Sequence, residues 1–158
     1  MTKRERGFMQ RAIELAEKGM NSNAGGPFGC VIVKGDEIIA EAHNKVTSTN
    51  DPTAHAEVVA IREACKKLDT FQLEDCVIYT SCEPCPMCLG AIYWARPKQV
   101  FYACTKEDAA QVHFDDQFIY DELDKKMTQR NIPFKQLMHE EGVAVFHKWE
   151  KKTDKTEY

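Results

Sequence analysis

The chain has 158 residues, of which 43% are hydrophobic and 29% are charged, and its formal net charge is −4. This length and composition predict a single globular domain, residues 1–158, with one hydrophobic core. Its basic residues are scattered, which argues against a nucleic-acid partner, and no apolar run reaches the roughly 20 residues needed to cross a membrane.

Helix and strand signals alternate along the N-terminal half. Apolar residues recur at helical spacing from Phe8 to Ala16 and predict an amphipathic helix that ends before Gly19. After a Gly-Gly-Pro loop, residues 28–33 and 37–42 flank a turn at 34–36 and predict a β-hairpin. The Asp-Pro-Thr break at 51–53 then begins a second helix, whose apolar stripe consists of Ile61, Ala64, Cys65 and Leu68.

The next segment continues the alternation. Residues 76–80 form a short β-branched run typical of a central strand, Pro84 and Pro86 bracket a helix start, and 99–103 predict another strand. Beyond Cys104 the pattern weakens to a helix near 115–123, a last strand near 134–138 and a last helix near 143–152. We therefore predict an α/β fold, a three-layer α/β/α sandwich around a mixed sheet of roughly five strands.

The cysteines are distributed unevenly. There are seven, an odd number, and the N-terminus has no signal-peptide core, so metal or thiol chemistry in the reducing cytoplasm is favoured over disulfides. Three of them cluster at Cys82, Cys85 and Cys88. The remaining four stand singly in apolar stretches and are interpreted as small buried hydrophobic residues: Cys30, Cys65, Cys76 and Cys104.

Two predicted helix starts carry the residues of a metal site. His55 follows the first break, and Cys85 and Cys88, three residues apart, project from one face of the second helix. An imidazole and two thiolates suit tetrahedral Zn²⁺, and three protein ligands leave the fourth position open to water, as in catalytic zinc sites. Helix N-termini pointing at the metal would favour the thiolates.

Glu57 is the candidate proton carrier. It lies two residues after His55, about 200° round a regular helix, so the two side chains converge only at the first turn. A carboxylate beside the zinc could accept a proton from water and deliver it to a ring nitrogen and to departing ammonia. The pattern H-x-E followed by P-C-x-x-C is the known signature of zinc deaminases of nucleobases.

The chain resembles the cytidine deaminase superfamily, and within it the bacterial guanine deaminase branch. The resemblance rests on P-T-A-H-A-E at 52–57 and on T-S-C-E-P-C-P-M-C-L-G-A-I-Y-W-A-R-P at 80–97. It extends to G-G-P-F-G at 25–29, the His43-Asn44 pair, F-D-D-Q-F-I-Y at 114–120 and the final Tyr158. It implies one Zn²⁺ per chain and hydrolysis of guanine to xanthine and ammonia, in purine catabolism or salvage.

The resemblance also implies the substrate site. Asn44 would hydrogen-bond the purine, Phe28 and Trp94 would help to form its pocket, and Asp116 and Tyr158 would complete it. Members of this branch are homodimers that exchange C-terminal segments, so Asp116 and Tyr158 could serve the partner's site.

Each candidate residue also has a simpler interpretation. Cys82 and Cys85 form a second C-x-x-C that could be a redox pair or an alternative ligand set, and Glu83, a second carboxylate near the ligands, could be catalytic or cap a helix. Trp94 and Phe28 could be core residues, Asn44 a turn former, and Asp116 an acidic residue at a helix start. Tyr158 stands at a chain end, and such ends are usually mobile.

Three other functions are compatible with the same motif. A guanosine deaminase would share most of these residues. A tRNA adenosine deaminase uses the same metal motif, but the acidic balance disfavours an RNA partner. In a protein of a different class, a binding module, the zinc would be structural.

Overall fold

The computed structural model describes residues 2–158, which divide into two compact units. The first unit extends to Asp116, and the second comprises Gln117–Tyr158. No helix among residues 2–158 is both long enough and apolar enough to span a bilayer.

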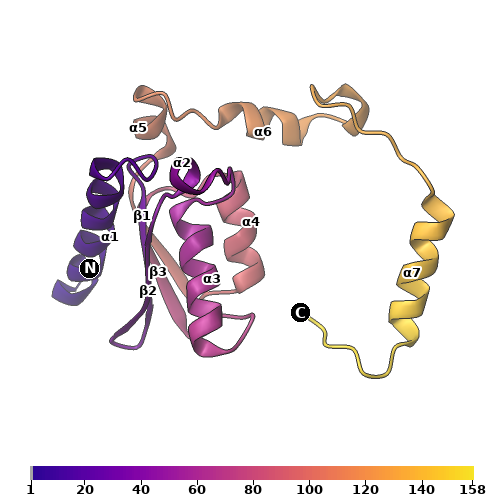
Figure 1. Cartoon of the computed structure of the whole chain (residues 1–158), viewed down its shortest axis with the longest axis horizontal. Helices are drawn as coiled ribbons and strands as arrows, with labels where there is room; N and C mark the ends of the chain where they lie inside the picture. The colour runs from indigo at the N-terminus through magenta and orange to yellow at the C-terminus, as the bar shows by residue number, and fades with distance from the viewer. Residues whose placement is uncertain (1) are drawn as a thin grey trace. The chain divides into compact units, whose positions relative to one another are not determined.

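A mixed four-stranded sheet forms the centre of the first unit (Figure 1). The strand order is β2-β1-β3-β4, with β1 antiparallel to both of its neighbours and β3 parallel to β4. The strands are β1 (Gly29–Lys34), β2 (Glu37–His43), β3 (Cys76–Cys82) and β4 (Gln99–Cys104). The predicted hairpin and the two later strands are therefore confirmed.

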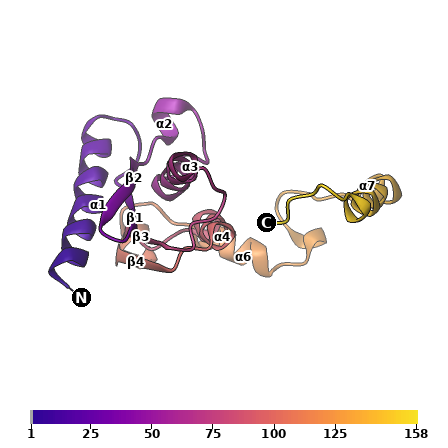
Figure 2. The ribbon, with the colours of Figure 1, turned by 90° about the horizontal axis from the view of Figure 1, so that it is seen from below.

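Helices cover both faces of this sheet. One face packs against α1 (Lys3–Asn21), and the other packs against α3 (Ala56–Leu68) and α4 (Pro86–Ala95) (Figures 1 and 2). The short helices α2 (Val46–Thr49) and α5 (Lys106–Gln111) lie in the connections. This arrangement confirms the predicted three-layer α/β/α sandwich.

The burial of β1 explains why its sequence is apolar without alternation. Val31 belongs to the cluster that α1 covers, together with Leu15 and Tyr79, whereas Ile32 belongs to the cluster that α3 and α4 cover. Successive side chains of a strand point to opposite faces, so a strand buried on both faces reads as a continuous hydrophobic run.

The second unit confirms the two predicted helices but not the predicted strand. It contains α6 (Gln117–Asp124), a 3-10 turn (Met127–Gln129) and α7 (His139–Lys151), and residues 134–138 do not form a strand. The sheet therefore has four strands where roughly five were expected. In this segment Phe134 is 50% exposed and Leu137 is 85% exposed. Alternating apolar residues make a strand only where a neighbouring strand accepts and donates the hydrogen bonds, and none pairs with this segment within residues 2–158.

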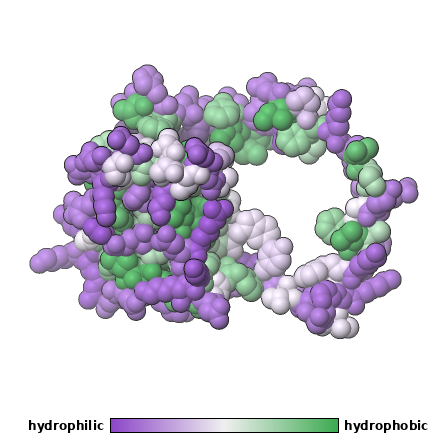
Figure 3. Space-filling model, viewed as in Figure 1, coloured by the Kyte–Doolittle hydropathy of each residue, from purple (hydrophilic) through white to green (hydrophobic). Residues whose placement is uncertain are grey.

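Nor does the second unit have a core of its own. All of residues 117–158 are described, and none of them is buried. Large apolar side chains lie at its surface (Figure 3), including Phe118, Leu123, Ile132, Phe134, Leu137, Val145, Phe146 and Trp149. A segment with so much exposed apolar surface is typical of one that packs on another chain.

We predict that Gly29→Ala destabilises the fold. A Cβ at Gly29 would lie 2.1 Å from the carbonyl oxygen of Ala12 and 2.6 Å from the nitrogen of Ala16, both in the backbone of α1. Separating α1 from the sheet should cost about 1–3 kcal/mol, as overpacking of a core commonly does.

Urea unfolding followed by circular dichroism measures this cost. The matched control is Gly7→Ala in α1, where a new Cβ meets nothing within 4 Å and should stabilise the helix by about 0.5–1 kcal/mol. An unfolding midpoint for Gly29→Ala at or above that of the wild type would contradict the packing described.

Candidate functional site

The three candidate metal ligands stand at the starts of two neighbouring helices. His55 is the N-cap of α3 and Cys85 the N-cap of α4, each with extended backbone angles, and Cys88 lies in the first turn of α4. Pro86 occupies the first helical position, where its fixed φ suits the helix and its missing N–H costs nothing. Both helix starts predicted from the sequence are confirmed.

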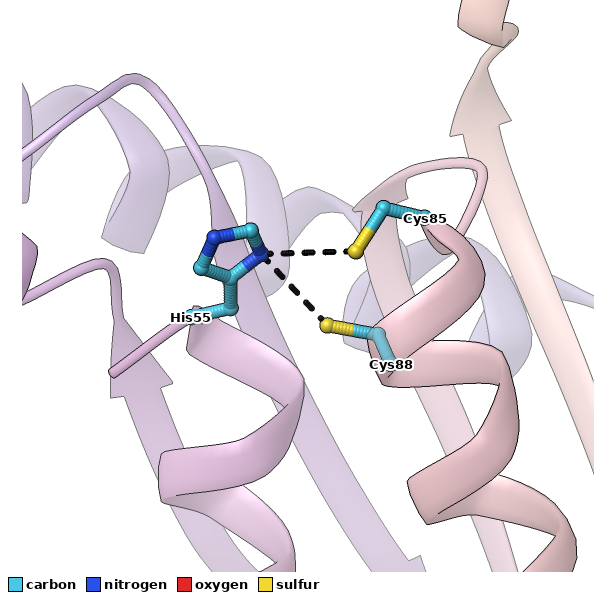
Figure 4. Close-up of side chains that lie close together, drawn as sticks. All are labelled: His55, Cys85 and Cys88. Carbon is cyan, nitrogen blue, oxygen red and sulfur yellow. Dashed lines mark hydrogen bonds between the residues drawn. The ribbon is translucent and has the colours of Figure 1, made fainter. Parts of the chain in front are cut away.

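Their ligand atoms converge. Nδ1 of His55 lies 3.6 Å from the sulfur of Cys85 and 3.6 Å from the sulfur of Cys88 (Figure 4). One ligand atom from each residue lies within 4.8 Å of the others. With zinc bonds of about 2.3 Å to sulfur and about 2.0–2.1 Å to nitrogen, tetrahedral coordination separates nitrogen from sulfur by about 3.6 Å. The donor set therefore fits zinc in both chemistry and spacing.

Local charge favours a cation at this position. Hydrogen bonds from Cys88 and His55 lower the pKa of the Cys85 thiol to about 4, and the same contact with Cys85 raises the pKa of His55. Cys85 is therefore a thiolate at neutral pH. The Cys88 thiol is buried and donates to Glu57 Oε2, and its contact with Cys85 and its burial raise its pKa, so binding of a divalent metal would release that proton.

Glu57 lies beside the ligands in the first turn of α3. It is 5% exposed, its Oε1 accepts a hydrogen bond from Thr80 Oγ1 at 2.9 Å, and its Oε2 lies 3.4 Å from the sulfur of Cys88. Burial raises the pKa of this carboxyl above its ordinary value. The structure thus brings Glu57 next to the three ligands, although among residues 2–158 the metal-sized cluster contains only His55, Cys85 and Cys88.

Thr80 is a site residue that the sequence analysis missed. The predicted strand included Thr80 only as a β-branched residue. In the structure the residue is 1% exposed, and its hydroxyl donates a hydrogen bond to Glu57. A hydroxyl in an otherwise apolar central strand needs a buried partner, and that requirement is the signal that could have identified it.

Asn44 follows β2 and is also buried close to the ligands. Its backbone N–H donates to the carbonyl of Phe28 at 2.9 Å, and the N–H of the next residue, Lys45, donates to the carbonyl of Ala54 at 2.9 Å. Because Ala54 directly precedes His55, these bonds attach the Asn44 loop to the metal-ligand segment.

Phe28 and Asp116 belong to the same unit as the metal ligands. Phe28 packs edge-on against Phe114, with ring centroids 5.0 Å apart, and also contacts the core cluster under α3 and α4. Asp116 is half-buried, and its pKa is raised first by burial and further by the charge of Cys85. Because the charge of Cys85 affects the pKa of Asp116, this carboxylate lies within electrostatic range of the metal site.

The other two predicted substrate residues are exposed in the single chain. Trp94 lies six residues beyond Cys88 on α4, a rise of about 9 Å along the helix, and is 65% exposed. The alternative that Trp94 is a core residue is therefore wrong. Tyr158 belongs to the second unit and is 70% exposed.

The structure also distinguishes between the alternative roles of Cys82 and Glu83. All seven cysteines are described and free. Burial raises the pKa of Cys82 to about 12, whereas a redox thiol has a lowered pKa. Glu83 accepts a hydrogen bond from the backbone N–H of Lys106 at 3.2 Å, which favours the helix-cap role at the start of α5.

Comparison with known proteins agrees with this geometry. The family model for the cytidine and deoxycytidylate deaminase zinc-binding region matches residues 2–104. Guanine deaminase of Bacillus subtilis (strain 168) is 60% identical over 151 residues, 96% of this chain and 97% of the relative.

Two further matches are a solved structure and a relative of lower identity. The crystal structure of the Bacillus subtilis guanine deaminase has a TM-score of 0.95 and 57% identity, covering 100% of this chain and 99% of that one. A tRNA-specific adenosine deaminase of Aquifex aeolicus is 43% identical over 96 residues, 61% of this chain and 63% of the relative. The helix-borne His-Cys-Cys cluster and these matches show that the chain belongs to the zinc-binding cytidine and deoxycytidylate deaminase family.

Proposed function

We propose that the protein is a zinc-dependent hydrolase that converts guanine to xanthine and ammonia. The observation that carries the proposal is the cluster of His55, Cys85 and Cys88 with the buried Glu57 carboxylate against it. The choice of guanine is supported by the extent of the similarity. The Bacillus subtilis guanine deaminase matches 96% of this chain, including its C-terminal segment, whereas the Aquifex aeolicus tRNA deaminase matches 61%.

In this proposal His55, Cys85 and Cys88 hold Zn²⁺. When bound, Zn²⁺ would act as a Lewis acid and lower the pKa of a water molecule. Glu57 performs the proton transfers. Its Oε1 accepts from Thr80 and its Oε2 accepts from the Cys88 thiol, so loss of the Cys88 proton on metal binding would leave Oε2 to accept a proton.

Burial of Glu57 has a direct chemical consequence. A raised pKa makes the protonated carboxyl easier to form near neutral pH, and the same group can then donate. Glu57 would carry the first proton of the attacking water to the purine ring nitrogen beside the reacting carbon, and then the second proton, from the hydroxyl added to that carbon, to the amine as the carbon–nitrogen bond breaks. One carboxyl thereby serves both steps.

The purine would lie between Asn44 and the aromatic pair. Phe28 and Phe114 offer an apolar surface to a flat ring, and Asp116 can accept a hydrogen bond from a purine N–H. We include Trp94 and Tyr158 in the substrate site as the resemblance implies, and both are exposed in the single chain.

We further propose a homodimer in which the C-terminal segment of one chain packs on the other. Residues 117–158 bury no side chain in the single chain. In the first unit, α4 exposes Leu89, Tyr93 and Trp94. A second copy of the chain would cover such apolar surfaces and would bring Tyr158 to the partner's site. The cytoplasmic location stays a prediction.

The substrate assignment predicts a defined order of turnover. Ammonia release should be fastest with guanine and slower with guanosine, adenine and cytosine, in protein that contains one zinc per chain by elemental analysis. Guanosine turnover above that of guanine would identify a nucleoside deaminase. Zinc without ammonia release from any of these compounds would indicate a structural metal.

The catalytic assignment predicts that Glu57→Gln keeps its zinc but loses about 10²- to 10⁴-fold in kcat, because a general acid and base commonly contributes that much. Glu63→Gln, an exposed change on the same helix, should be neutral. Cys88→Ser should lose zinc, whereas Cys104→Ser at an exposed thiol should retain it. Near-normal turnover by Glu57→Gln would contradict the mechanism.

The exchange of C-terminal segments predicts complementation between two inactive variants. A chain lacking Tyr158 and a full-length Glu57→Gln chain should each be inactive alone. After unfolding and refolding together, their mixed dimer should regain activity, because one site then has an intact Glu57 and receives Tyr158 from its partner. Continued inactivity of a mixed dimer verified by native mass spectrometry would show that the segment acts within its own chain.

A further inference from the structure

Asn44 fits its loop only because the residue facing it is a glycine. A Cβ at Gly25 would lie 2.1 Å from Asn44 Oδ1 and 2.8 Å from the Asn44 backbone carbonyl oxygen. Gly25 does not have a positive φ, so backbone conformation does not require glycine there. The requirement is space for the side-chain amide of Asn44, which makes the shortest contact, and for its backbone carbonyl.

The orientation of this amide is fixed by one hydrogen bond. The backbone N–H of Val46 donates to Asn44 Oδ1 at 3.1 Å, and since a backbone N–H can only donate, the atom facing it must be the oxygen. Within residues 2–158, the Nδ2 group of Asn44 donates to no protein atom. Asn44 therefore offers its N–H donors, while one lone pair of its Oδ1 is engaged by Val46.

His43 supports the same residue from the other side. Nδ1 of His43 lies 3.0 Å from the backbone carbonyl of Asn44, which can only accept, so Nδ1 carries the proton. The histidine ring is in turn closely packed, because a Cβ at Gly19 would lie 2.7 Å from its Cγ. A ring held this tightly restricts the backbone of Asn44.

We propose that Gly25 and His43 are positioning residues that hold the Asn44 amide as a hydrogen-bond donor to an acceptor atom of the purine, a carbonyl oxygen or an unprotonated ring nitrogen. The inference rests on the proposed function for its ligand. It goes beyond that function by stating that Asn44 donates to the purine, and by naming Gly25 and His43 as the residues that position it.

A double-mutant cycle tests whether Gly25 acts through Asn44. Gly25→Ala should retain zinc and lower kcat/KM for guanine by about 10-fold, mostly through KM, as expected for one misplaced hydrogen bond. In an Asn44→Ala background the same change should cost clearly less, because only the contact with the backbone carbonyl of residue 44 remains. Gly7→Ala on α1, where a Cβ meets nothing within 4 Å, is the matched control. An equal loss in both backgrounds would overturn the proposal.

Asn44→Asp tests the polarity of the contact. The carboxylate can still accept from Val46 N–H but has no N–H to donate, so kcat/KM should fall at least as far as in Asn44→Ala. Full activity of Asn44→Asp would overturn the donor role. His43→Ala should raise KM, and His43→Asn, whose amide N–H can replace Nδ1, should restore it. Lack of rescue would remove His43 from the proposal.

Crystal structures of the wild type and Gly25→Ala give a readout that needs no substrate. The variant should lose the bond from Val46 N to Asn44 Oδ1 while His55, Cys85 and Cys88 stay in place. An unchanged Asn44 would overturn the inference even if guanine is the substrate. If the wild type turns over a different base, the proposed substrate fails, and this structural comparison still decides the positioning role.

Discussion

The convergence of two helix starts on one point is the constraint on which the site depends. The N-caps of α3 and α4 carry His55 and Cys85, and the first turn of α4 adds Cys88. Since helix N-termini carry partial positive charge, they favour the thiolate that His55 and Cys88 stabilise at Cys85. A shift of either helix would separate ligand atoms that now lie at zinc-binding distance.

The sheet positions these helices and supplies the remaining polar contacts. β3 is a buried central strand between β1 and β4, and Thr80 near its end bonds to the Glu57 carboxyl. Both groups are buried, and an unpaired carboxyl or hydroxyl in the core would lower the stability of the fold, so this hydrogen bond is needed. The core thus holds the proton carrier in one orientation, with Oε2 toward Cys88.

The two units follow different physical rules. The first buries apolar residues on both faces of its sheet, which gives it a defined architecture. The second has regular helices but buries none of its residues within the single chain. In the proposed dimer a second chain would cover its exposed apolar surface. Local patterns beyond Cys104 predicted its two helices, whereas the predicted strand at 134–138 is absent within residues 2–158.

The sequence by itself determined the elements of the sandwich and the metal ligands. Apolar periodicity and helix-start residues act locally, and the spacing of Cys85 and Cys88 places both on one helix face. Only the tertiary structure decided what depends on distant segments: Thr80 opposite Glu57, Gly25 against Asn44, the exposure of Trp94 and the absence of a strand at 134–138 within residues 2–158. The reason is that each of these depends on a partner far away in the chain, which no local pattern encodes.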